Sequence, residues 1–125
     1  MDQNKYQQMQ LLDYQIKQLQ KVMESIDIQL TEISNTKDAL IEFEKLENNS
    51  EILFPVASGI FAKGKISDNK LLRINIGSNV TVEKSIKDTI VMMDNQAKEI
   101  EKYKKEVLTQ LQKYIDTMNN LQEEN

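Results

Sequence analysis

The chain holds few of the side chains that enzymes use to make and break bonds. Its 125 residues include no histidine and no cysteine, which excludes thiol nucleophiles, Ser-His-Asp arrangements, disulfides and the common zinc sites. Carboxylates are plentiful, but pairs such as Glu99 and Glu101 fall at solvent-facing helix positions without the apolar shielding that acid–base catalysis needs. The sequence therefore predicts a protein that is not an enzyme, with no catalytic residues, no cofactor and no metal.

One segment has the spacing of a nucleotide-binding motif. Gly59 to Lys65 reads GIFAKGK, which matches the GxxxxGK skeleton of a phosphate loop. The next residue is Ile66, where Mg²⁺ coordination requires Ser or Thr, and a strand pattern follows instead of a helix. We therefore attribute these glycines to turns or bulges and expect no nucleotide binding.

Charge and hydropathy narrow the class of partner. The net charge is −4, and no basic stripe with interleaved aromatic residues exists, so nucleic acid is not the expected partner. No apolar run reaches membrane-spanning length, and the polar start MDQNKYQQMQ has no signal-peptide pattern. We expect a soluble cytoplasmic protein that does not bind membranes.

The segment 51–84 divides the chain. It holds all three glycines and the only proline, and its apolar residues recur every second position. The flanking segments have helical periodicity instead. We expect one domain over 1–125, with a coil helix over 1–50, a β region over 51–84 and a second coil helix over 85–125.

Each flank carries a heptad seam, that is, apolar residues at alternating spacings of three and four. The first seam is Met9, Leu12, Ile16, Leu19, Met23, Ile26, Leu30 and Ile33, and the second is Ile86, Ile90, Met93, Ala97, Ile100, Lys104, Val107, Leu111, Tyr114, Met118 and Leu121. The seams match position for position if the helices run antiparallel with facing residue numbers that sum to about 130. Lys37 and Lys104 place one charge in each seam, and we interpret them as register-fixing polar positions or as stems that reach out to solvent.

The ends of both helices carry local signals. Asn48-Asn49-Ser50 is expected to end the first helix, which the pattern extends to Phe43 and Leu46. Ser85 and Asp88 have the spacing of a capping box at the start of the second. The predicted fold class is α+β: a long antiparallel two-helix coiled-coil hairpin whose small β insert forms two β-hairpins and oligomerises.

The β region cannot bury enough surface to stand alone. Four strands are expected, with a turn at Ser67 to Lys70 between the hairpins and another at Gly77 to Asn79. Apolar side chains occur on both faces, including Leu53, Phe61 and Leu71. We expect this region to join subunits.

The free ends of the coil admit two interpretations. Met1, Tyr6, Met9 and Leu12 lie at the free end of the first helix, and Tyr114, Met118 and Leu121 close the second. They are either the last layers of the coil or a flexible apolar surface that binds many partners. The residue types alone leave both open.

The β region and its flanks resemble the prefoldin family, in particular its archaeal α-type subunits. The resemblance is carried by Leu53-Phe54-Pro55-Val56, Gly64-Lys65-Ile66, Ile76-Gly77 and Val82-Glu83-Lys84-Ser85. It implies a hexamer of two α-type and four β-type subunits, whose coil tips hold non-native proteins without ATP and deliver them to a cytosolic group II chaperonin. It also implies client contacts at Tyr6, Met9, Leu12, Tyr114, Met118 and Leu121, and an assembly sheet of Ile52, Phe54, Val56, Leu72, Ile74, Ile76, Val80 and Val82.

A different function remains open beside this one. The alternative is a structural role, in which the same chain type forms a homo-oligomer or filament through its β region and the coils act as spacers.

Overall fold

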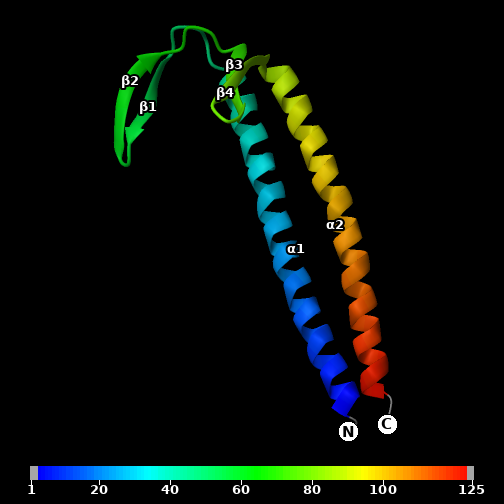
Figure 1. Ribbon diagram of the computed structural model, residues 1–125. Coiled ribbons are helices and arrows are strands. Elements are labelled where there is room, and N and C mark those ends of the chain that lie inside the picture. The colour runs from blue at the N-terminus through cyan, green and yellow to red at the C-terminus, as the bar shows by residue number, and fades with distance from the viewer. Residues whose placement is uncertain (1–2, 124–125) are drawn as a thin grey trace. The chain divides into compact units, whose positions relative to one another are not determined.

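The computed structural model describes residues 3–123. Two long helices, α1 (Gln3–Glu44) and α2 (Ile86–Glu123), come first and last along the chain (Figure 1). Between them in sequence are the strands β1 (Glu51–Ala57), β2 (Ile60–Lys65), β3 (Leu71–Gly77) and β4 (Val80–Ser85). The predicted α+β fold class and element order are confirmed. Within the described residues, neither helix is long and apolar enough to cross a membrane. The chain divides into two compact units, one made of 3–33 with 96–123 and the other of 34–95.

The first unit is an antiparallel pair of helices, in which the start of α1 lies beside the end of α2 (Figure 1). Every predicted seam residue in it is buried or half-buried, and Ile26 is the most covered at 3% exposure. Lys104 donates to Asp27 across the pair, with 2.9 Å between Nζ and Oδ1. Their residue numbers sum to 131, which confirms the predicted register.

The helical part of the second unit follows the same register. Lys37 of α1 pairs with Asp94 of α2, and these numbers also sum to 131. Both seam lysines therefore reach an aspartate on the opposite helix. Of the two interpretations offered for these lysines, this favours register-fixing polar positions over stems that only reach out to solvent.

The end of α1 differs from the prediction. The helix stops at Glu44 and not near residue 48, and its last turn tightens through the bonds from the Lys45 and Leu46 amides to the carbonyls of Glu42 and Phe43, at 3.2 and 3.1 Å. Leu46 is exposed and is not a seam residue. Tertiary bonds from the β region satisfy the carbonyls at this end, so the helix ends before its local stop signal.

The start of α2 follows its local signal. The Asp88 amide donates to Ser85 Oγ at 3.0 Å, so Ser85 is the N-cap. Asp88 also places a carboxylate in the first turn, where the helix dipole favours negative charge. Ile86, the most deeply buried side chain of the described residues, begins the helix.

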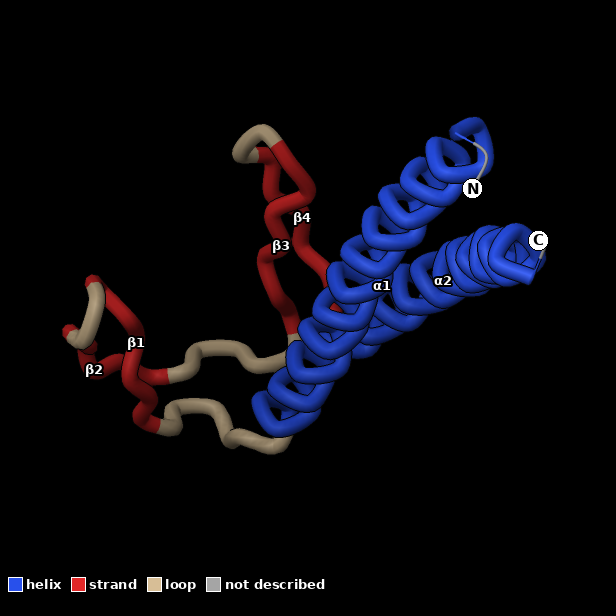
Figure 2. Tube along the Cα trace, turned by 90° about the horizontal axis from the view of Figure 1, so that it is seen from below, coloured by secondary structure: helices blue, strands red, loops and turns tan. Residues whose placement is uncertain are grey.

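The four strands form two separate antiparallel hairpins, β1–β2 and β3–β4 (Figure 2). They repeat one geometry at an offset of twenty residues: Ala57 pairs with Ile60 and Gly77 with Val80, each just after a bulge. The repeat extends beyond the strands. The amide of buried Ile66 donates to the Ser50 carbonyl, and at the equivalent position the amide of buried Ile86 donates to the Lys70 carbonyl. The β region is thus a tandem duplicate of one supersecondary unit.

Candidate functional site

The open end of the coil brings together side chains from both termini. A pocket of about 360 Å³ there is lined by Tyr6, Met9, Gln10 and Asp13 of α1 and by Met118 and Gln122 of α2. Tyr6 is 54% exposed, whereas the other five residues predicted to contact clients are half-buried because they pack in the last seam layers. Met1, also predicted at this end, lies outside the described residues. The end of the coil is therefore a partly open apolar layer.

Two further apolar side chains near this end were not predicted from the sequence. Leu11 and Tyr14 are 59% and 61% exposed on the outer surface of α1. They lie off the heptad seam, so they gain nothing from packing against α2. The sequence does contain a signal for these two residues, because a large apolar residue at a surface position of a heptad has no role in packing the coil. With Tyr6, they are three exposed apolar side chains near this end of α1.

The hairpins expose half of their eight predicted assembly residues. Phe54, Val56, Ile76 and Val80 are exposed, and Ile52, Leu72, Ile74 and Val82 are half-buried. Ile74 and Val82 pair across β3 and β4, while Val56 and Ile76 lie at the two bulges and have no cross-strand partner. Apolar side chains this open on short two-stranded sheets are typical of surfaces that contact other proteins.

The two hairpins differ in the residues on the face opposite the predicted assembly residues. In β1–β2 that face presents exposed Leu53 and Phe61, whereas the equivalent positions in β3–β4 are Arg73 and Thr81. The first hairpin therefore has two apolar faces and the second has one, with Leu71 exposed at its base.

The glycines of the phosphate-loop pattern have two different roles. Gly59 has a φ of +74° in the β1–β2 turn, which confirms its prediction as a turn residue. Gly64 is neither in a turn nor at a bulge, so that interpretation was wrong for it. The ring of Phe54 covers its Cα, and a methyl group there would overlap the ring.

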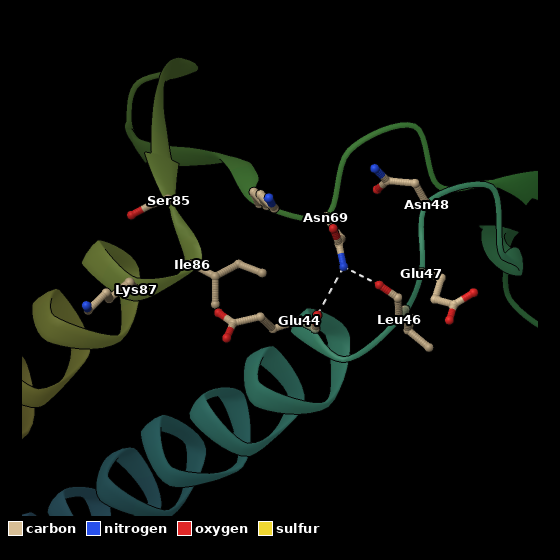
Figure 3. Close-up of a pocket in the computed structure, with 9 residues that line it drawn as sticks. Glu44, Leu46, Glu47, Asn48, Asn69, Ser85, Ile86 and Lys87 are labelled. Carbon is tan, nitrogen blue, oxygen red and sulfur yellow. Dashed lines mark hydrogen bonds between the residues drawn. The ribbon is translucent and has the colours of Figure 1, made fainter.

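A pocket of about 560 Å³ lies within the second unit, where the end of α1 meets the linker between the hairpins. Figure 3 shows the Asn69 amide pointing at the carbonyls of Glu44 and Leu46, to which it donates, the first at 3.1 Å. Asn69 is buried, and the Lys70 amide bonds Asp68 Oδ1 at 2.8 Å. The predicted turn at 67–70 therefore exists, and it also caps α1. Among the described residues, no group of three or more acidic side chains is placed to hold a metal.

Comparisons with known proteins agree on one family. A sequence model described as "Prefoldin subunit" matches residues 12–125. The chain is 28% identical over 111 residues to "Prefoldin subunit alpha" of Methanococcus vannielii, covering 89% of this chain and 74% of that protein. It is 27% identical over 122 residues to the protein of the same name from Archaeoglobus fulgidus, covering 98% and 89%. "Prefoldin subunit alpha 1" of Thermococcus kodakarensis is 34% identical over 74% of this chain and 63% of that protein.

A solved structure has the same fold. A chain of the filamentous PFD from Methanocaldococcus jannaschii, determined by cryo-EM, superposes with a TM-score of 0.85. The match covers 96% of this chain and 99% of that one at 14% identity, so the likeness concerns the fold alone. Together with the match of the family model over most of the chain, the sequence identities confirm the resemblance noted first in the β region: the chain belongs to the prefoldin family and is similar to its archaeal α subunits.

Proposed function

We propose that this chain is a subunit of an ATP-independent chaperone that holds non-native proteins at the ends of its coils. The observation that carries the proposal is the exposure of the apolar side chains of Tyr6, Leu11 and Tyr14 near the half-buried last layers of the coil. A two-helix coil cannot cover such side chains itself, since each helix has only one partner. Exposed apolar segments of an unfolded protein are their natural complement.

The contact residues proposed at the tip are Tyr6, Met9, Leu12, Tyr114, Met118 and Leu121, with Leu11 and Tyr14 added from the structure. One such surface is small, so each contact is weak. Affinity would come from several coils that engage one client at once. Met9 and Met118 suit this role because flexible thioether side chains adapt to unrelated surfaces.

Assembly is proposed to run through the β region. The open strand edges and apolar faces of both hairpins favour pairing with neighbouring chains. By analogy with the family, the partners would be β-type subunits in a hexamer of two α-type and four β-type chains. We further propose that residues 1–125 act as one domain, that the complex is cytoplasmic, and that it passes clients to a group II chaperonin.

The tip proposal is tested by replacing Tyr6, Leu11 and Tyr14 with serine in the assembled complex. We expect suppression of aggregation of a chemically denatured client to fall sharply, as measured by light scattering, while the native mass of the complex stays unchanged. Ile28→Ser is the matched control, since Ile28 is equally exposed, at 59%, on the same helix away from its end. Equal loss of activity in the control and the tip variant, or no loss in either, would refute the proposal.

A structural role is the second candidate, and the filamentous form of the solved neighbour is what favours it. In this case the chain alone would form a large homo-oligomer through its hairpins. Native mass measured for the chain alone and then with a β-type partner separates the two candidates. A discrete complex formed only with the partner supports the chaperone, and an open-ended polymer of the single chain supports the structural role.

A further inference from the structure

The coil of the first unit has two unlike sides, which follow from its confirmed register. One side consists of the residues that immediately precede alternate seam residues on both helices. We call it the neutral side, and its members are Gln8, Gln15, Val22, Gln29, Gln96, Tyr103, Gln110 and Thr117. None of them carries a charge, although charged residues make up 29% of the chain.

The opposite side has a different composition. It consists of Tyr6, Asp13, Gln20, Asp27, Glu101, Leu108, Ile115 and Gln122, and all three of its charged members are acidic. Both aspartates already have partners, since Asp13 pairs with Lys17 and Asp27 with Lys104. Both sides flank the same seam, so the difference is not imposed by packing of the coil itself.

The neutral side is also hollowed near its middle. Val22 and Gln29 of α1 and Tyr103 of α2 line a groove of about 290 Å³, whose floor is formed by the seam residues Ile26 and Ile100. Tyr103 is 50% exposed, and Glu99 lies at the margin as the one charged residue of the lining. With Gln29 and Ser25 in the same lining, the half-exposed tyrosine offers a rigid apolar plane near adaptable hydrogen-bonding groups.

We propose that this groove is a second contact site for clients, and that its occupant is an uncharged, apolar-rich segment of a non-native polypeptide. The inference rests on the proposed function and extends it from the coil end to one side of the coil. The lack of charge on this side determines which kind of segment can bind there. A charged side chain pressed against this side would lose its hydration and, away from the margin at Glu99, find no opposite charge. An uncharged segment avoids that penalty, and the glutamines can bond its backbone.

The surface of a second coil fits this side less well. The other outward faces of this coil include charged residues such as Lys17, Lys21, Glu24, Lys98 and Lys102, and these would be desolvated against the neutral side. Two copies meeting through their neutral sides would avoid this cost, so that arrangement is a distinct outcome of the test.

The test uses the natural absence of cysteine. A single cysteine replaces Gln29 on the neutral side or, as matched control, Gln20 on the acidic side, both being exposed glutamines of α1. Each is labelled with benzophenone maleimide before assembly of the full complex, and a denatured client is added under light. We expect several-fold more client crosslinked from position 29 than from position 20.

A second pair of variants checks the charge argument. Gln29→Glu places a carboxylate beside the groove and is expected to weaken client binding about tenfold, because burial of an unpaired charge costs at least that factor. Gln20→Glu, the same change on the acidic side, is expected to leave client binding unchanged.

The outcomes separate the two proposals. Equal crosslinking from both positions by a complex that still prevents aggregation overturns the groove proposal and leaves the tip proposal intact. Crosslinking of one copy of this chain to another from position 29 without client also overturns it, in favour of a coil–coil interface. A complex that holds no client at all removes both proposals.

Discussion

The ion pair between Asp27 and Lys104 gives the sharpest test of how the two helices are aligned. Lys104 is the one charged residue in the seam of α2, and it reaches an aspartate more than seventy residues away in sequence. Only an antiparallel arrangement in this register brings the two side chains together. Exchanging their charges therefore tests orientation and register at once.

The expected magnitude follows from the geometry and exposure of the pair. The Nζ and Oδ1 atoms are 2.9 Å apart, but the side chains are 33% and 59% exposed, so the attraction is screened to about 0.5–1 kcal/mol. Asp27→Lys removes it and brings two ammonium groups together, which adds roughly 1 kcal/mol of repulsion in a water-like medium. Lys104→Glu does the same with two carboxylates. Each single reversal should thus lower the free energy of unfolding by about 1.5–2 kcal/mol.

The assay is a double-mutant cycle on thermal unfolding, followed by circular dichroism at low and at high salt. The double reversal should recover most of the loss, with a coupling energy of about 3 kcal/mol that shrinks at high salt. The Asp13–Lys17 pair within α1 is the control, since its double reversal reports no interhelical contact and is expected to change stability by only a few tenths of a kcal/mol. Additive losses in the Asp27–Lys104 cycle would refute the register.

Three further predictions concern the β region and the helix ends. Gly64→Ala should displace the ring of Phe54; because that ring is 45% exposed and can turn toward solvent, the cost should stay at about 1 kcal/mol, the low end for overpacking, seen as weaker assembly in native mass measurements; an unchanged complex would contradict it. Asn69→Ala should leave two carbonyls at the end of α1 without their donor and cost about 1–3 kcal/mol, with faster amide exchange in residues 66–70 as its signature; exchange that rises equally throughout the chain would count against it. Ser85→Ala should remove the N-cap of α2 and cost about 1 kcal/mol, whereas Ser85→Asp should keep stability near the starting value in the same thermal unfolding assay.

The helices could be predicted from sequence because their packing is periodic and local. A heptad repeat predicts which side chains face the partner helix, and the two lysines in the seams limit the registers in which the helices can pair. Ile26 and Val107 are accordingly buried where the repeat places them. The N-cap at Ser85 is local as well, since its acceptor and donor are three residues apart.

The features that were mispredicted or missed depend on distant residues. The end of α1 is set by an asparagine 23 to 25 residues away, which no local stop signal reveals. The need for glycine at position 64 arises from a ring on the neighbouring strand, so reading Gly64 as a turn or bulge residue was wrong. Leu11 and Tyr14 are exposed on the coil and were overlooked because the seam is the stronger pattern in the sequence.

The two hairpins were predicted, but their repetition of one geometry at an offset of twenty residues was missed, for a different reason. Equivalent positions such as Leu53 and Arg73 have unlike chemistry, so a comparison of residue types hides the repeat. What is shared is the bulge and the buried isoleucines at 66 and 86, which become apparent once the strand pairing is known.

The claim that the open end of the coil holds non-native proteins can be tested directly through the chain's six methionines. Met9 and Met118 line the pocket at the coil end, whereas Met92 and Met93 lie in the first turns of α2. With methionine methyl groups labelled in the assembled complex, addition of a denatured client should shift or broaden the NMR signals of Met9 and Met118 and leave those of Met92 and Met93 unchanged. Changes confined to Met92 and Met93 would contradict the account.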